Sequence, residues 1–68
     1  MDIKKIFGAK VKALRVDNCW SQETLALNAE LDRTYIPGIE SGSRNVSLVT
    51  IEKLAKAYAL TVSELLKF

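Results

Sequence analysis

The residue types that carry most covalent chemistry are scarce in this chain of 68 residues. Histidine is absent, so the chain has neither an imidazole base nor an imidazole metal ligand. The single Cys19 excludes an internal disulfide and a zinc site built from several thiolates. The three glycines form neither a phosphate-binding loop nor a dinucleotide-binding motif. These absences argue against an enzyme, and we expect a binding function without a cofactor or metal.

Basic side chains are concentrated near the start of the chain, although the formal net charge is only +2. Asp2 is the one acidic residue before Asp17, whereas the same stretch contains the basic residues Lys4, Lys5, Lys10, Lys12 and Arg15. Such a bias could attract an anionic partner. A solvated helix face would have the same composition, so charge alone does not decide between the two interpretations.

The length and composition are typical of one small folded domain, which we expect to span residues 1–68. Hydrophobic residues make up 49% of the chain and charged residues 26%. No apolar stretch is long enough for a membrane-spanning helix, and no signal-peptide hydrophobic run follows the first residues. We therefore expect a cytoplasmic protein that makes no membrane contact and is too short for a separate small-molecule effector domain.

Apolar residues recur at helical spacing along the whole chain, which predicts an all-α fold, a compact five-helix bundle. We expect helices over residues 3–17, 22–29 and 33–41, a fourth after residue 47, and a last one over residues 62–67. The predicted N-caps are Ser21, Asp32, Ser47 and Thr61, the last with Glu64 as a capping box. The apolar positions expected to face the core include Ile3, Phe7, Val11, Leu14, Leu25, Ile36, Ile39, Leu48, Ile51, Leu54, Tyr58 and Leu65.

The two short helices at residues 21–29 and 33–41, joined by a tight turn, have the spacing of a helix-turn-helix. In that unit the first helix crosses the phosphate backbone of DNA, and the N-terminal end of the second enters the major groove. The second helix is expected to begin with Arg33, Thr34 and Tyr35, which would then point toward the bases.

At these residues the chain resembles the Cro/C1-type (Xre) helix-turn-helix family, which implies a lambda-repressor-like DNA-binding fold. The matching residues are Phe7-Gly8, Leu14-Arg15, Ser21-Gln22-Glu23, Leu25-Ala26, Tyr35-Ile36, Ile39-Glu40, Gly42, Arg44-Asn45, Ser47-Leu48, Ile51, Leu54-Ala55 and Leu65. Residues 31–36, 38–40 and 43–45 are similar to the controller proteins of restriction-modification systems. That similarity implies a homodimeric transcription regulator that binds a near-palindromic operator in double-stranded DNA and times expression of the endonuclease.

The resemblance also implies roles for single residues in the helix-turn-helix. Gln22 matches a glutamine that contacts a phosphate and braces the recognition helix. Arg33 matches the main base-reading residue, for which bidentate binding to guanine is the commonest specific contact. Thr34 matches a second base contact, and Tyr35 matches a residue at the backbone and at flexible pyrimidine–purine steps. Each could instead be an ordinary first-turn or surface side chain.

Further contacts are implied in the loop after the recognition helix. Arg44 and Asn45 match a loop that reaches bases or phosphates in controller proteins, and Ser43 and Ser47 could add phosphate hydrogen bonds. Arg44 could alternatively be a mobile surface charge.

Arg15 and Glu40 match a pair that the family forms between the first and third helices. The pair would orient the recognition helix instead of touching DNA. Because breaking a buried ion pair leaves one buried charge without a partner, we expect Glu40→Ala to unfold or loosen the domain.

Two positions depart from the family pattern. Glu30 stands where the family usually has glycine, and a left-handed conformation there would cost about 1–2 kcal/mol. Pro37 lies inside the expected third helix, as its fifth residue after an Asp32 cap. There it would delete the hydrogen bond to the Arg33 carbonyl at a cost of about 3 kcal/mol. We expect residues 33–36 to stay helical, with a local kink or a 3₁₀ segment at Pro37. Alternatively, Pro37 disrupts the recognition helix.

The apolar residues Val49, Val62, Leu66 and Phe68 remain as candidates for a two-fold dimer interface. Val62 and Leu66 could instead merely close the small core. Other functions compatible with the pattern are a phage-type repressor, an autoregulating antitoxin, and a protein-interaction module of the same fold that no longer binds DNA.

Overall fold

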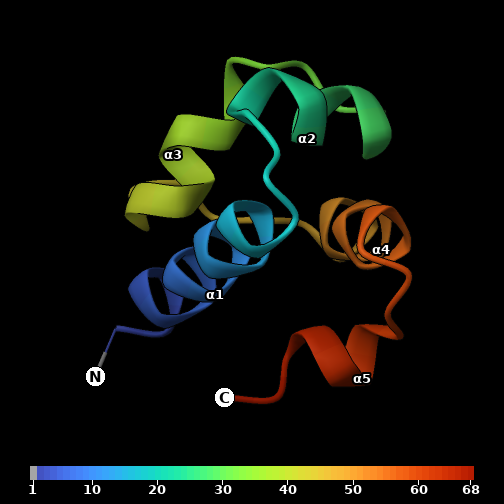
Figure 1. Cartoon of the computed structure of the whole chain (residues 1–68). Coiled ribbons are helices and arrows are strands. Elements are labelled where there is room, and N and C mark those ends of the chain that lie inside the picture. Colours follow the sequence, from blue (N-terminus) through green and yellow to red (C-terminus); the bar gives the residue numbers. More distant parts are fainter. Residues whose placement is uncertain (1) are drawn as a thin grey trace.

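The structure is a computed structural model that describes residues 2–68, and every regular element within that range is an α-helix. The helices are α1 (Ile3–Asp17), α2 (Gln22–Asn28), α3 (Tyr35–Ser41), α4 (Leu48–Ala57) and α5 (Val62–Leu65). Figure 1 shows α2 and α3 together at one end of the bundle, α1 across its middle, and α5 at the opposite end. The all-α prediction is confirmed. None of the helices in residues 2–68 has the length and apolar character needed to cross a membrane.

The helix starts follow the capping residues that the sequence predicts, with one exception. Ser21, Ser47 and Thr61 each accept a hydrogen bond from the backbone N–H three residues later. Thr61 and Glu64 form the predicted capping box, because the Glu64 carboxylate also accepts from the Thr61 N–H at 2.9 Å. The exception is Asp32, because the expected helix over residues 33–41 begins only at Tyr35.

The core lies where α1, α3, α4 and α5 converge beneath α2. Its fully buried side chains are Val11, Leu25, Ile36, Ile39, Leu54 and Leu65. Two expected core residues are instead exposed: Ile3 retains 57% and Leu48 79% of its possible accessible surface. Each is the first residue of its helix, so helical spacing alone misplaces them.

Close contact between α1 and α3 depends on Gly8. A Cβ built on Gly8 would overlap the carbonyl oxygen of Ile39 and would lie 2.6 Å from that of Glu40. Only hydrogen at this position lets the backbone of α3 approach α1 so closely. Gly8 therefore sets the distance at which α1 supports α3.

Four helix ends share one turn geometry. The residue after the cap of α1, α2 and α4 has a positive φ, at Cys19 (57°), Glu30 (56°) and Ala59 (56°), and Gly42 (79°) takes this conformation at the end of α3. The N–H groups of Glu30 and Leu31 donate hydrogen bonds to the carbonyls of Leu27 and Ala26, respectively, which is the pattern of a Schellman motif. The structure thus places a non-glycine residue in the left-handed region at Glu30.

Candidate nucleic-acid interface

A turn, and not a helix, carries the first two residues of the expected recognition helix. Asp32 Oδ1 accepts hydrogen bonds from the Thr34 N–H at 2.9 Å and from the Thr34 hydroxyl at 2.8 Å. The Tyr35 and Ile36 N–H groups donate to the carbonyls of Asp32 and Arg33, three residues back in each case. Arg33 and Thr34 therefore precede α3 in a tight turn. The two hydrogen bonds from Thr34 lower the pKa of the Asp32 carboxyl below its usual value, so the group carries a charge at neutral pH.

The late start of α3 also corrects the interpretation of Pro37. Pro37 is the third residue of α3, and the first turn of a helix has no intrahelical acceptor for its N–H groups. The Arg33 carbonyl accepts from Ile36 at 3.3 Å, so Pro37 does not leave it without a partner. The expected interior position of Pro37 is therefore wrong, and the cost of an interior proline does not apply, because proline is tolerated in a first helical turn. The hydrogen bonds of Tyr35 and Ile36 to the carbonyls three residues back are of the 3₁₀ type, the alternative expected beside a kink.

Arg33 extends from this turn into solvent, with 73% of its side-chain surface exposed. Its Nη1 lies 3.5 Å from Glu23 Oε2, across the turn between α2 and α3. Thr34 is also exposed, although its hydroxyl is already hydrogen-bonded to Asp32. Because Asp32 also binds the Thr34 backbone N–H, the methyl group is the part of the side chain that makes no protein hydrogen bond.

Tyr35 and Arg44 form a second exposed feature beside α3. The Arg44 guanidinium carbon stands 4.4 Å from the centroid of the Tyr35 ring, within the range of a cation–π contact. Gly38 lies next to Arg44, and a Cβ built on it would stand 3.4 Å from Arg44 Cβ, an ordinary van der Waals distance. The Gly38 carbonyl accepts from the N–H groups of Ser43 and Arg44 at 3.1 and 3.2 Å, which holds the loop against α3.

The remaining polar candidates lie in the loop after α3 and at the start of α4. Ser43 and Asn45 are exposed in the loop after α3, and the Ser43 hydroxyl donates to the Gly38 carbonyl at 3.4 Å. Ser47 caps α4: its Oγ accepts from the Thr50 N–H at 3.1 Å. A phosphate would have to share the Ser47 hydroxyl with this cap.

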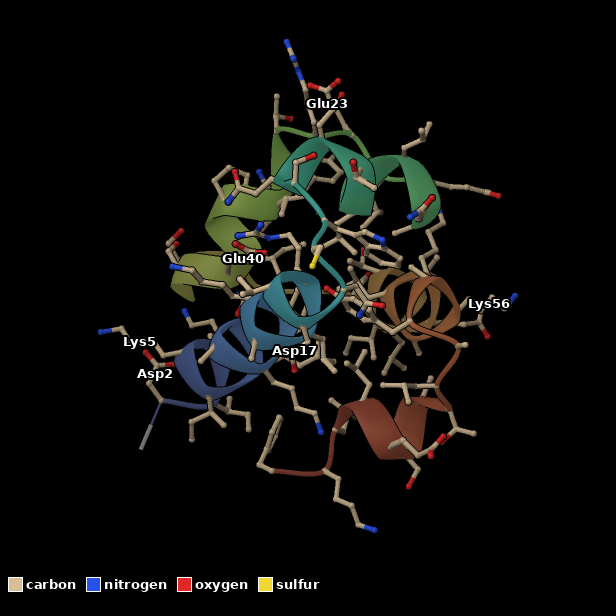
Figure 2. All side chains as sticks on the ribbon, in the orientation of Figure 1. Asp2, Lys5, Asp17, Glu23, Glu40 and Lys56 are labelled. Carbon is tan, nitrogen blue, oxygen red and sulfur yellow. The ribbon has the colours of Figure 1, made fainter. Side chains whose placement is uncertain are left out.

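A polar cluster between three helices holds α3 in place. Arg15 Nε donates to Glu40 Oε2 at 2.7 Å, and Arg15 Nη2 donates to Glu40 Oε1 at 3.2 Å. Arg15 Nη1 also donates to the Trp20 carbonyl, and Gln22 Nε2 to Glu40 Oε1 at 3.1 Å. The side chains of Arg15 and Glu40 are 14% and 5% exposed, and Figure 2 shows Glu40 between α3 and α1. The hydrogen bonds that Arg15 donates to the Glu40 carboxylate raise the pKa of Arg15 above its already high value.

Two features of this region escaped the sequence analysis. Glu23 approaches Arg33 because the turn folds the chain back on α2, and the two residues are ten positions apart in the sequence, so local patterns do not reveal the contact. Lys10, one of the basic residues of α1, donates to the carbonyls of Glu64 and Lys67, so it joins α1 to the α5 segment. The basic bias of the first helix is therefore partly structural.

Comparison with known proteins connects this geometry to a family. The helix-turn-helix family model matches residues 11–65 of the chain. Control protein C.MunI of Mycoplasma is 51% identical over 65 residues, which covers 94% of this chain and 88% of that protein. Control protein C.BamHI of Bacillus amyloliquefaciens is 47% identical over 68 residues, covering 98% of this chain and 84% of the relative.

A solved structure extends the similarity to three dimensions. The restriction-modification controller protein C.AhdI from Aeromonas hydrophila has a TM-score of 0.85 and 50% sequence identity, and the match covers 94% of this chain and 96% of that one. The family match and these relatives show that the chain belongs to the Cro/C1-type helix-turn-helix family of transcription regulators, and that restriction-modification controller proteins are among its relatives.

Proposed function

We propose that this protein is a sequence-specific DNA-binding regulator that controls a restriction-modification operon from a near-palindromic operator. The observation that carries the proposal is the exposure of Arg33 in the turn just before α3, with α3 held by the buried Arg15–Glu40 pair. An exposed guanidinium on a rigid support can bind guanine O6 and N7 with two donors at once. Relatives of nearly equal length that are named as control proteins support the same conclusion.

The other exposed groups fit contacts around that central one. The methyl of Thr34 suits the thymine methyl group, since its hydroxyl is held by Asp32. Tyr35 and Arg44 together present a flat, positively charged surface that suits the sugar-phosphate backbone and the adjoining base step. Ser43 and Asn45 supply further hydrogen-bonding groups in the same loop. Gln22 Nε2 keeps its hydrogen bond to Glu40, which leaves the second N–H of the amide to donate to a phosphate.

We further propose that the regulator acts as a homodimer, because one short recognition helix supplies too few contacts for operator affinity. The exposed apolar residues Val49, Leu66 and Phe68 are the candidates for the interface. Leu66 and Phe68 line an apolar pocket of 190 Å³ between the start of α1 and the C-terminus, which a second copy could fill. Val62 is half-buried and packs on the core, so it would add only its outer edge.

The proposed function is tested by DNA binding at several salt concentrations. A duplex enriched from a random-sequence pool by the wild-type protein is compared with a scrambled duplex of equal length, using fluorescence anisotropy. We expect the affinity to fall steeply with salt, because each phosphate neutralised releases counterions. Arg33→Ala should weaken binding to the enriched duplex by about 1–3 kcal/mol and reduce discrimination between the duplexes.

Lys56→Ala is the matched control, since it removes one exposed positive charge from α4, on a different side of the molecule from α2 and α3 (Figure 2). It should leave discrimination unchanged. Weak retention on both duplexes that does not respond to salt would contradict the proposal and favour a protein-interaction module. A reporter fused to the promoter of the protein's own operon then tests whether the bound site regulates transcription.

A further inference from the structure

An acidic side chain stands beside the residue that is proposed to read the bases. Glu23 lies in the first turn of α2, and its Oε2 is 3.5 Å from Arg33 Nη1. The two side chains are 76% and 73% exposed, and Figure 2 shows Glu23 at the outer end of α2, pointing away from the bundle. A negative charge at this place opposes the approach of any polyanion, so its position calls for an explanation other than attraction to DNA.

The pair contributes too little to folding to explain its presence. Exposed ion pairs between flexible side chains have a median contribution close to zero, because water screens them and both chains lose freedom. Both side chains are mostly exposed, and Oδ1 of Asp32, the other acid beside Arg33, already accepts two hydrogen bonds from Thr34. Glu23 is thus the carboxylate that is free to act on the Arg33 guanidinium.

We propose that Glu23 is a specificity-determining residue, which lowers non-specific DNA binding more than it lowers binding to the operator. The inference rests on the proposed function, because it requires Arg33 to bind guanine. In a complex with the correct sequence, two donors of the guanidinium bind the base and the others remain free for Glu23. The negative charge of Glu23 is then offset by Arg33.

In a complex with the wrong sequence the balance differs. Without a guanine in place, the strongest acceptors within reach of Arg33 are the phosphates. If Arg33 turns to a phosphate it leaves Glu23, whose carboxylate then faces the backbone without a neighbouring positive charge. The first helix of a helix-turn-helix, here α2, crosses the phosphate backbone, so the uncompensated charge of Glu23 would lie close to phosphates and be repelled by them. Glu23 thereby penalises the non-specific complex selectively.

The test compares Glu23→Gln with Glu52→Gln, using the full chain and both duplexes defined above. Each variant removes one exposed negative charge and keeps the shape of the side chain, but Glu52 lies on α4. We expect Glu23→Gln to raise affinity for the scrambled duplex about fivefold and affinity for the enriched duplex less than twofold. Glu52→Gln should change both affinities by the same small factor.

A second comparison shows whether the effect passes through Arg33. In an Arg33→Ala background, Glu23→Gln should change both affinities equally, because no guanidinium is left to distinguish the two complexes. The role of Glu23 would be overturned if Glu23→Gln, in the otherwise wild-type protein, changed the affinities for both duplexes equally. It would also be overturned if the substitution lowered only the affinity for the enriched duplex. If the wild-type protein itself does not discriminate between the duplexes, the proposed function fails, so the two failures are distinguishable.

Discussion

The carboxylate of Glu40 joins three helices through single side chains. It accepts two hydrogen bonds from Arg15 in α1 and one from Gln22 in α2, and its own backbone belongs to α3. With 5% of its side chain exposed, Glu40 depends on these donors to offset the loss of water. The residue thus connects the stability of the bundle to the direction of α3.

Glu40→Ala should lower the free energy of unfolding by about 3 kcal/mol, because it leaves the largely buried guanidinium of Arg15 with no opposite charge. The value lies at the lower end for buried pairs since the side chain of Arg15 is 14% exposed. Urea denaturation measures the change, with Glu52→Ala as the exposed control. A variant that kept full stability and lost only operator affinity would show that the pair has no structural role.

Gly8 and Gly38 make opposite predictions for the same substitution. Gly8→Ala should destabilise the fold by about 1–3 kcal/mol or more, because its Cβ would overlap carbonyl oxygens of α3. Gly38→Ala should be neutral or stabilising by up to about 1 kcal/mol, since its nearest neighbour is 3.4 Å away and alanine favours helix. Thermal unfolding of the two variants checks both values, and equal melting temperatures would contradict the contact at Gly8.

At the scale of the elements, the turn between α2 and α3 determines what the helix-turn-helix presents. If Asp32 were the N-cap of α3, Arg33 and Thr34 would be the first two residues of the helix. Because Asp32 instead binds Thr34 in a turn, α3 is two residues shorter at its start and Pro37 falls in the first turn. The turn therefore makes Pro37 compatible with α3 and leaves Arg33 in an exposed position.

Pro37→Ser should lower stability by about 0.5 kcal/mol, because proline restricts the unfolded chain and costs no hydrogen bond at this position. An interior proline would give the opposite sign, with serine more stable by about 3 kcal/mol. The difference in urea midpoint between the two proteins decides the sign. A clear gain in stability would place Pro37 inside the helix after all.

The positive φ of Glu30 should make it a site for stabilisation. Glu30→Gly should raise stability by about 1 kcal/mol, because glycine takes this conformation without steric cost. For a chain of this size that corresponds to a rise in melting temperature of about 4–8 °C. Glu52→Gly, inside α4, is the control and should lower stability by about 1 kcal/mol. A lower melting temperature for Glu30→Gly would contradict the left-handed turn.

On the scale of the whole molecule, the two proposed surfaces lie at different ends of the bundle. Arg33 and Glu23 belong to the end formed by α2 and α3, whereas Leu66 and Phe68 follow α5 at the other end (Figure 1). This separation allows two copies to associate without covering the residues proposed to contact DNA. An α-helix such as α3 fits the major groove, and the two copies of a dimer would bind half-sites about 34 Å apart.

Leu66→Asp should shift the protein from dimer to monomer, because it would bury a charge in an apolar contact. Sedimentation velocity measures the assembly state over a range of protein concentrations. Leu27→Asp is the matched control, because Leu27 is equally apolar, 78% exposed and placed on α2. Unchanged sedimentation of Leu66→Asp would remove this residue from the interface.

Local patterns account for most of what could be foreseen. Helical spacing and short-range caps predict the five helices, and the Thr61–Glu64 capping box appears as expected since both partners lie within one turn. The start of α3 could not be foreseen because Asp32 can cap a helix or bind Thr34 in a turn, and both use the same side chain. The exposure of Leu48 and the contact between Glu23 and Arg33 depend on how helices pack, which spacing does not describe.

The sequence by itself determined the helical class, the family, and the residue types that can meet DNA, because periodicity, caps and an ordered motif are properties of neighbouring residues. The tertiary structure alone decided where Arg33 stands, what Glu40 holds, and that Glu23 faces the guanidinium. These depend on the close approach of α1 to α3 at Gly8 and on the turn at Asp32. Contacts between distant segments arise only when the chain has folded, so they become visible only in three dimensions.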